Sequence, residues 1–449
     1  MNDHKIEEGL RKLASIDRSA ARSAWALFLG SEQSEKDEVE GLVDILLDRK
    51  IAKNYEKQIR LEPPPPETCK GRYQIGKVCY PHKTMFCEFG LRENEWIKHL
   101  LIVGMTGAGK TTLMFCVLSE LAKSQKPFLV FDWKQNYRDL IQRPEFGQLR
   151  IYTIARPTRP FNFNPLLPPN GTHPGEWLMK LVDVIKHAYF VGEGVEYLLR
   201  NAIDQVYRRC GVLDGETKLT PNFEMVKTHI LALRLQGRMS LWKASTMRVL
   251  DALCFSHGLG SVINCKSNND LETALQQMAV LELDALADSD KIFLTEAIIL
   301  WIYEHRKKQA DREHFKHALI IEEGHHILSQ AKEKTEGAET IMETCLRQIR
   351  EFGEAVLVID QEPTKLSNSI KANTYTKICF ALGNGKDALE MSNCMGLDKE
   401  EADYLNLLEV GYAIVSLKGR IHQPLHIRFS KIDINKGEIT DHKLTQHQR

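Results

Sequence analysis

A glycine-rich stretch of nine residues has the composition and spacing to bind phosphate groups. It reads Gly-Met-Thr-Gly-Ala-Gly-Lys-Thr-Thr, follows an apolar run at residues 99–103, and precedes a segment with helical periodicity. Glycines in such a strand-to-helix turn let backbone N–H groups surround phosphate oxygens, and the helix N-terminus adds its dipole. The sequence therefore predicts a P-loop that binds nucleotide through Gly104, Thr106, Gly107, Ala108, Gly109, Lys110, Thr111 and Thr112.

Two side chains of this stretch predict which nucleotide and which ion it binds. Lys110 places a cation against the β- and γ-phosphates, and the Thr111 hydroxyl can join the coordination of Mg²⁺. We therefore expect ATP and Mg²⁺ at this turn.

Hydrolysis also needs a carboxylate beside the phosphates, and residues 318–321 form an apolar run that ends in Glu322 and Glu323. We expect Glu322 to orient Mg²⁺ or its water shell, and Glu323 to polarise the attacking water. Glu322 is one methylene longer than the aspartate usual at such a position. The alternative is an acidic strand end that caps the following helix. His325 and His326 come next, and we favour a supporting role for both.

Polar residues end two further apolar runs. Gln361 follows residues 355–360, where a neutral amide can hydrogen-bond both the γ-phosphate and the lytic water, so it is a candidate sensor. Asp132 follows residues 128–131 and either faces the same crevice or caps a turn with Trp133 and Lys134.

Continuous apolar runs with polar ends suit strands that are buried on both faces, as in a parallel sheet flanked by helices. Another run covers residues 378–382, and residues 411–416 and 424–429 read as a hairpin. Between Pro165 and about residue 315 the helical signal dominates. The sequence thus predicts an α/β fold with a mainly parallel sheet and a helical insertion at about 167–315.

The N-terminal residues form a separate unit in this reading. Residues 1–62 carry two segments with helical periodicity and are expected to be a docking segment, unless their apolar stripe covers the core of the chain itself. Four prolines begin a linker at 63–70, because consecutive prolines favour extended backbone. The ATPase domain is expected to cover 71–449.

Composition excludes several protein classes. A length of 449 residues suits two or three domains, and 60 Lys+Arg balance 60 Asp+Glu. With no net charge, any contact with DNA must come from local basic loops. Ten cysteines without CxxC spacing, a polar N-terminus and the lack of a span-length apolar run indicate a reducing cytoplasm and no membrane segment.

Several motifs in order resemble the HerA/FtsK superfamily of P-loop ATPases, and HerA more than FtsK. Besides the P-loop, the motifs that carry this resemblance are Val130-Phe-Asp-Trp-Lys, Phe161-Asn-Phe-Asn-Pro-Leu, Leu319-Ile-Ile-Glu-Glu-Gly-His-His, Arg350-Glu-Phe-Gly, Val358-Ile-Asp-Gln-Glu-Pro and Leu408-Glu-Val-Gly-Tyr-Ala.

This resemblance implies a RecA-like core, assembly into hexameric rings, and ATP-driven movement of double-stranded DNA through a central pore. It also points to Arg350 as a catalytic arginine for a neighbouring subunit's nucleotide; the alternative for Arg350 is a cap at the end of its helix. HerA proteins usually begin with a small β-barrel that binds a nuclease, whereas residues 1–62 here are predicted to be helical.

The expected role is a ring motor in a DNA-processing or antiviral complex, with a nuclease or another effector protein as a possible partner. The alternative is an ATP-dependent switch that does not translocate DNA. Loops at the carboxyl ends of parallel strands are the expected DNA contacts, since open α/β sheets bind ligands there. The candidates, with solvated surface lysines as the alternative reading, are Lys332, Lys334, Lys365 and Lys371.

Overall fold

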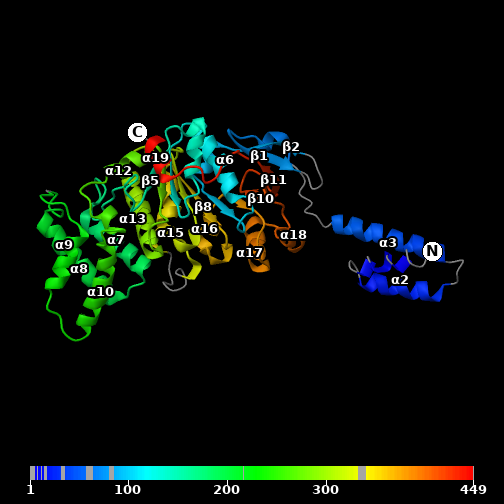
Figure 1. Cartoon of the computed structure of the whole chain (residues 1–449), viewed down its shortest axis with the longest axis horizontal. Coiled ribbons are helices and arrows are strands. Elements are labelled where there is room, and N and C mark those ends of the chain that lie inside the picture. The colour runs from blue at the N-terminus through cyan, green and yellow to red at the C-terminus, as the bar shows by residue number, and fades with distance from the viewer. Residues whose placement is uncertain are drawn as a thin grey trace.

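The computed structural model describes residues 6–7, 9–11, 13–14, 18–31, 36–56, 64–79, 85–215, 217–331 and 340–447. The molecule is long in one direction (Figure 1). The N-terminal helices α2 (Arg18–Gly30) and α3 (Lys36–Glu56) lie at one end, and the helices of the insertion lie at the other. Between them lies the sheet.

Eleven strands of the described residues form one mixed sheet, in the order β2-β1-β11-β10-β9-β3-β8-β7-β4-β6-β5. The run from β9 to β5 is parallel throughout, and β10, β11, β1 and β2 add an antiparallel edge. The strand bounds are β1 Tyr73–Cys79, β2 Met85–Leu91, β3 Leu100–Val103, β4 Phe128–Asp132, β5 Arg150–Thr153, β6 Met278–Glu282, β7 His317–Ile321, β8 Glu354–Asp360, β9 Thr376–Cys379, β10 Tyr412–Leu417 and β11 Leu425–Phe429.

The P-loop strand lies inside the parallel part. Every residue of β3 is buried, and β3 pairs with β8 on one side and β9 on the other. The apolar composition of these strands follows from this position, because a strand covered on both faces has no polar side. The predicted α/β class with a mainly parallel sheet is confirmed, and so is the hairpin of β10 and β11.

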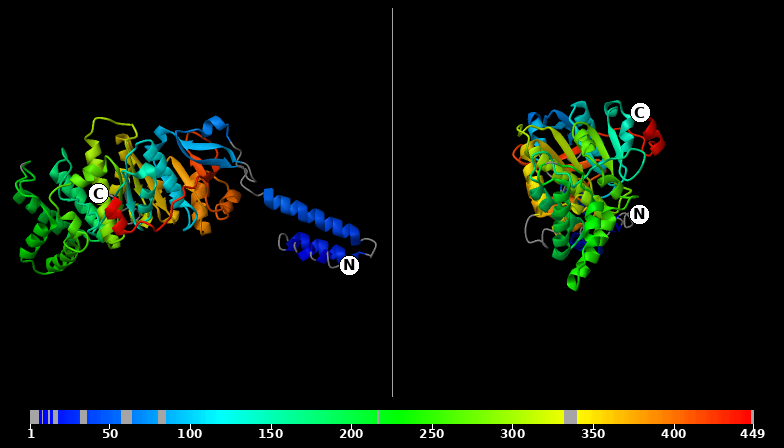
Figure 2. Two further views of the ribbon diagram at one scale, coloured as in Figure 1. Left: turned by 45° about the horizontal axis from the view of Figure 1, so that its top comes forward. Right: turned by 90° about the vertical axis from the view of Figure 1, so that its left-hand side faces the viewer.

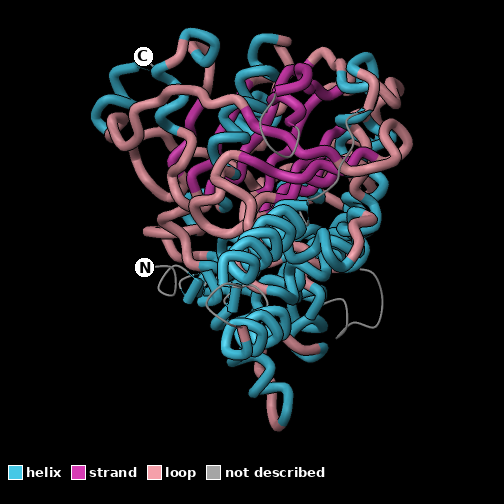
Figure 3. Tube along the Cα trace, turned by 90° about the vertical axis from the view of Figure 1, so that its right-hand side faces the viewer, coloured by secondary structure: helices cyan, strands magenta, loops and turns pink. Residues whose placement is uncertain are grey.

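Helices cover the sheet on both faces, and Figure 3 shows the strands as one layer with helices around it. Crossovers between parallel strands are right-handed, so the direction of each crossover along the sheet decides which face its helix covers. The crossover from β3 to β4 runs in one direction and places α6 on one face. Those from β6 to β7, β7 to β8 and β8 to β9 run in the opposite direction and place α13, α15 and α16 on the other face. Most of α13 is buried, which explains why its middle part is mainly apolar. The bounds of the core helices are α4 Pro66–Cys69, α5 Glu93–Trp96, α6 Lys110–Lys123, α13 Asp288–Lys307, α15 Ile341–Gln348, α16 Asn368–Asn373, α17 Gly385–Met395, α18 Lys399–Tyr404 and α19 Asp441–His447.

The segment expected to be a helical insertion differs from the prediction in one respect. It contains six helices before α13, but also β6, which lies in the sheet between β4 and β5. The sequence Met-Ala-Val-Leu-Glu is too short for its periodicity to distinguish a strand from a buried helical turn, so the expectation of helices alone missed it. The insertion helices are α7 Pro174–Tyr189, α8 Glu193–Cys210, α9 Phe223–Ala232, α10 Arg238–Leu253, α11 Gly260–Ile263 and α12 Asn269–Ala274.

The N-terminal and C-terminal segments of the chain both lie outside the sheet (Figure 1). After β11 the chain crosses back over the molecule, and α19 ends beside β5 and α12 (Figure 1). The N-terminal helices have a hydrophobic cluster of their own, distinct from the main core. Within the part of the chain that the structure describes, no helix combines the length and the apolar content needed to cross a bilayer.

Candidate functional site

The P-loop joins the end of β3 to the first residue of α6. Gly109 has φ 119°, and a Cβ atom there would lie 3.2 Å from the backbone nitrogen of Gly411, so an L-residue would be strained in conformation and in space. Lys110 Nζ donates to the carbonyl oxygens of Gly104 and Met105. Burial lowers the pKa of Lys110, while the carboxylates of Glu323 and Asp360 oppose that shift.

A cavity of about 240 Å³ opens beside this loop. Six of the eight predicted nucleotide-binding residues line it, namely Thr106, Gly107, Gly109, Lys110, Thr111 and Thr112. Gly104 and Ala108 shape the loop instead: Gly104 N donates to the carbonyl of Asp360, and Ala108 O accepts from Gly411 N. The cavity therefore has the backbone amides, the lysine and the hydroxyl groups that a polyphosphate needs.

The predicted acidic pair lies on the same cavity, directly after β7. The Glu322 carboxylate is buried and accepts a hydrogen bond of 2.8 Å from the hydroxyl of Tyr137. Glu323 adopts the left-handed conformation with φ 50°, which turns its carboxylate toward the P-loop. Lys134 Nζ donates to Glu323 Oε1, across 189 positions of sequence. The two carboxylates are thus held apart, each by its own donors.

Asp132 lies beneath this pair and does not line the cavity. Its carboxylate oxygens accept from the backbone nitrogens of Lys134 and Tyr137, at 3.0 and 3.2 Å, so it caps the turn after β4. Burial and the nearby charge of Glu322 raise the pKa of Asp132 to about 8. Burial also raises the pKa of Glu322.

These crowded carboxyl groups, with the Thr111 hydroxyl on the same cavity, fit a divalent cation held mainly by substrate oxygens. A bound dication lowers the cost of two buried negative charges, and Mg²⁺ is usually held by one or two protein groups together with phosphates. Glu322 and Thr111 are the residues here that would hold it.

Gln361 connects the P-loop to the carboxylate of Glu323. Thr106 Oγ1 donates to Gln361 Oε1 at 2.5 Å, and Gln361 Nε2 donates to Glu323 Oε1 at 2.7 Å. All three side chains line the cavity. The amide therefore lies where it can contact both a terminal phosphate and a water molecule activated by Glu323.

Asp360, the last residue of β8, holds both partners of that pair. One carboxylate oxygen accepts from the backbone nitrogens of Gln361 and Glu362, at 2.7 and 2.8 Å. The other accepts from the backbone nitrogen of His325 at 2.7 Å and lies 3.0 Å from His325 Nδ1. Asp360 is buried, and its hydrogen bond raises the pKa of His325. One carboxylate thus fixes the turn that carries Glu323 and the turn that carries Gln361.

The two histidines lie behind the cavity rather than on it. His326 stacks on Trp133 with ring centres 4.6 Å apart. The ammonium group of Lys291, on α13, lies 5.1 Å from the centre of the same Trp133 ring. The geometry places both histidines as supports of the turn after β7.

Sequence reasoning did not predict several residues that line the cavity, among them Asn136, Tyr137 and Lys436. Asn136 and Tyr137 follow the Asp132 turn closely, so the end of β4 was a usable signal. Lys436 had none. Lys436 lies on the C-terminal segment. The Asp139 carboxylate fixes that segment by accepting hydrogen bonds from the backbone nitrogens of Gly437 and Ile439, at 2.6 and 3.1 Å.

Arg350 lies far from the cavity of its own chain. It belongs to the short helix Ile349–Phe352 that precedes β8, whereas the P-loop follows β3, and these two strands are parallel. The seven residues of β8 put about 20 Å between the two edges of the sheet. Arg350 is exposed, so any contact with a nucleotide has to be made with a neighbouring copy.

The four lysines expected to contact DNA have different positions. Lys332 and Lys334 lie outside the described residues. Lys365 is exposed and pairs with Glu362 at 2.8 Å. Lys371 is buried and pairs with Glu390, so the prediction that it contacts DNA was wrong. Its position after a strand end suggested exposure, but α17 packs over it.

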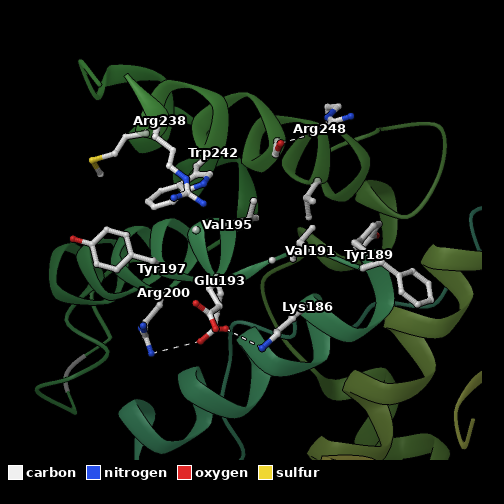
Figure 4. A pocket seen from close by; sticks show the side chains of 17 residues that line it. Lys186, Tyr189, Val191, Glu193, Val195, Tyr197, Arg200, Arg238, Trp242 and Arg248 are labelled. Atoms are coloured by element: carbon white, nitrogen blue, oxygen red, sulfur yellow. Dashed lines mark hydrogen bonds and ion pairs between the residues drawn. The ribbon is translucent and has the colours of Figure 1, made fainter. Parts of the chain in front are cut away.

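A second cavity, of about 1450 Å³, lies within the helical insertion between α7, α8 and α10 (Figure 4). Glu196 pairs there with Lys186 at 3.2 Å and with Arg200 at 3.7 Å. Arg238 lies over the ring of Trp242. The volume exceeds that of usual small-molecule sites, about 300–1,000 Å³. The phosphate chemistry therefore belongs to the smaller cavity.

Comparison with known proteins agrees with this geometry. Residues 73–299 match the model of the family described as "Helicase HerA, central domain". The DNA double-strand break repair helicase HerA of Sulfolobus acidocaldarius is 24% identical over 394 residues, which cover 84% of this chain and 72% of that protein. VirB4 of Thermoanaerobacter pseudethanolicus has a similar structure, with a TM-score of 0.62 at 14% identity over 81% of this chain and 97% of VirB4. The plasmid coupling protein TrwB in complex with ADP and Mg²⁺ gives a TM-score of 0.56 at 12% identity, over 78% of this chain and 88% of TrwB.

Proposed function

Because this chain belongs to the family of the HerA central domain, and is a P-loop ATP hydrolase of a DNA-translocating ATPase family, we propose that it uses ATP to translocate or remodel double-stranded DNA as a ring, with six subunits as the expected number. The expected setting is a DNA-processing or antiviral complex in the cytoplasm, with a nuclease or another effector as partner.

The observation that carries this proposal is the chain of contacts from Thr106 through Gln361 to Glu323. A protein that only binds nucleotide needs the P-loop, but it does not need a strand-end glutamine bonded to both the P-loop and a carboxylate. This arrangement supports a hydrolysis cycle in which Gln361 reports the state of the terminal phosphate to the turn after β7.

The side chains suggest a division of work in that cycle. Lys110 exchanges its bonds to the P-loop carbonyls for bonds to the β- and γ-phosphates and stabilises the charge that develops there. Glu323 takes the proton of the attacking water, and Gln361 orients that water. The buried Glu322 and the Thr111 hydroxyl would hold Mg²⁺, which would neutralise phosphate charge when bound.

Lys134 is the residue that regulates the catalytic base in this proposal. Its ammonium group donates to Glu323 Oε1, the oxygen that also accepts from Gln361 Nε2. Two donors on one carboxylate oxygen occupy the lone pairs with which Glu323 would accept a proton. The phosphates attract the same ammonium group, so nucleotide binding would release Glu323 for catalysis.

An ATP-dependent switch that does not translocate DNA is the second candidate. The burial of Lys371 favours it, because one of the predicted DNA contacts is not available at the surface. The balanced charge of the whole chain points the same way.

Steady-state ATP hydrolysis with and without linear double-stranded DNA tests the proposal, with Lys110→Ala as the inactive control. We expect stimulation by DNA that falls steeply with added salt, because phosphate contacts release counterions. ATP hydrolysis without any DNA binding or stimulation would reject translocation and leave the switch.

A further inference from the structure

The N-terminal helices form a small unit with its own core. Residues 6–14 contribute a helical stretch whose described part packs on α2 and α3. The buried side chains of this cluster are Ile6, Leu10, Leu13, Ala21, Ala24, Phe28, Val39, Val43 and Leu47. The unit lies beyond the β1–β2 edge of the sheet in both views (Figures 1 and 2). The apolar side chains of this cluster therefore pack against each other in the interior of the unit.

The outer faces of the two long helices are apolar as well. On α2, Trp25 and Leu29 are 37% and 71% exposed and lie one turn apart. On α3, Leu42 and Ile45 are 39% and 55% exposed and also lie about one turn apart. Side chains of this kind, gathered on the faces of one small unit, indicate an interaction surface rather than the scattered apolar residues of an ordinary surface.

The two outer faces carry opposite charge. Arg22 precedes Trp25 by three positions, so it shares the outer face of α2, a helix that contains arginines but no acidic residue. Glu38 precedes Leu42 by four positions and shares its face of α3, whereas Asp44, adjacent to Ile45 in sequence, points about 100° away from it around the helix. All three charged side chains are exposed. The α2 face is thus apolar and basic, and the α3 face is apolar and acidic.

We propose that the outer face of α2 in one copy of this chain packs against the outer face of α3 in the next copy, so that the N-terminal units form a collar on the ring. The inference rests on the proposed ring. Two α2 faces pairing with each other would bring Arg22 against Arg22, and two α3 faces would bring acidic groups together. Opposite charge therefore selects the head-to-tail contact, which repeats around a closed ring.

The size of the contact indicates when it forms. Two apolar side chains from each helix bury far less than the roughly 1,200 Å² typical of a stable complex. Isolated units should therefore associate weakly. In a ring the neighbouring units are tethered to subunits already in contact, and the high effective concentration lets a weak contact form. The collar should thus stabilise rings rather than create dimers.

Charge reversal in the full-length protein tests the collar. The first variant is Arg22→Glu and the second is Glu38→Lys. In each variant alone, the two faces that meet at every contact carry the same sign of charge. We therefore expect the protein concentration for half-maximal ring assembly to rise about tenfold, as measured by mass photometry with ATP. A mixture of the two variants should restore assembly, because alternating subunits present opposite charges at every contact. Arg11→Glu, an equal change on the first helical stretch, is the matched control.

The outcomes separate the collar from the proposed function. Unchanged assembly of the two reversal variants, or a mixture that stays as defective as its components, overturns the collar while wild-type rings persist. A mixture that recovers can arise only from contacts between copies, so a folding defect within one chain cannot imitate it. Wild-type protein that forms no ring rejects both the collar and the ring. DNA stimulation, measured on the same samples, reports on translocation separately.

Discussion

Replacing Asp360 by asparagine should uncouple Glu323, the proposed catalytic base, from Gln361, the proposed sensor. Asparagine keeps one oxygen for the backbone nitrogens of Gln361 and Glu362, but turns an amide NH₂ group toward His325. A donor then faces the His325 N–H group that now bonds to a carboxylate oxygen at 2.7 Å. Hydrogen bonds to charged groups contribute about 1.5–3 kcal/mol each, so losing the two contacts to the backbone and ring of His325 should cost roughly 3–6 kcal/mol.

The kinetic effect follows from the position of His325, two residues after Glu323. A displacement of about 1 Å in a catalytic group can cost about 100-fold in rate. We therefore expect kcat for ATP hydrolysis to fall about 100-fold in Asp360→Asn, with KM changed by less than about threefold, because the P-loop residues keep their contacts. The matched control is Asp290→Asn, which removes a carboxylate bonded to Tyr189 in the insertion and should lower stability without lowering kcat. A normal kcat in Asp360→Asn would show that Glu323 is positioned by other contacts.

The same variant has a predicted pH dependence. Asp360 raises the pKa of His325 above its unfolded value of about 6.5. Glu323, His326 and Lys365 also face His325, but the hydrogen bond to Asp360 is the largest cause. Stability from a raised pKa is fully present below the unfolded pKa and is lost as pH rises through the folded pKa. Thermal unfolding should thus show the largest gap between wild type and Asp360→Asn below about pH 6, and a smaller gap at alkaline pH.

Three further predictions concern single roles in the cycle. Lys110→Ala should abolish hydrolysis, measured as phosphate release, because the cation on the β- and γ-phosphates is gone. Glu323→Gln should bind a fluorescent ATP analogue normally but turn over at least about 100-fold more slowly, since the amide cannot take a proton; near-normal turnover would assign the base elsewhere. Arg350→Ala should be inactive alone but regain activity when mixed with Lys110→Ala, because an intact arginine can then face an intact P-loop in a neighbouring copy; full activity of Arg350→Ala by itself would contradict a role between subunits.

Local sequence patterns were sufficient to predict which side chains meet at the candidate site. The P-loop, the acidic pair after β7 and Gln361 after β8 each depend on a short apolar run and the polar residues that end it. Strands buried on both faces must be apolar, and parallel strands bring their carboxyl ends to one edge, so local pattern was enough to predict that Lys110, Glu323 and Gln361 meet.

The partners that contact those groups come from distant parts of the chain and could not be predicted from local patterns. The contact of Lys134 with Glu323 spans 189 positions, and the contact of Asp139 with Ile439, which brings Lys436 to the cavity, spans 300. The burial of Lys371 beneath α17 and the position of β6 inside the sheet are of the same kind. Such contacts depend on how distant segments pack, and the sequence of a short segment does not specify which distant segments will contact it. The sequence therefore determines which groups can react, and packing determines their charge, their order and their surroundings.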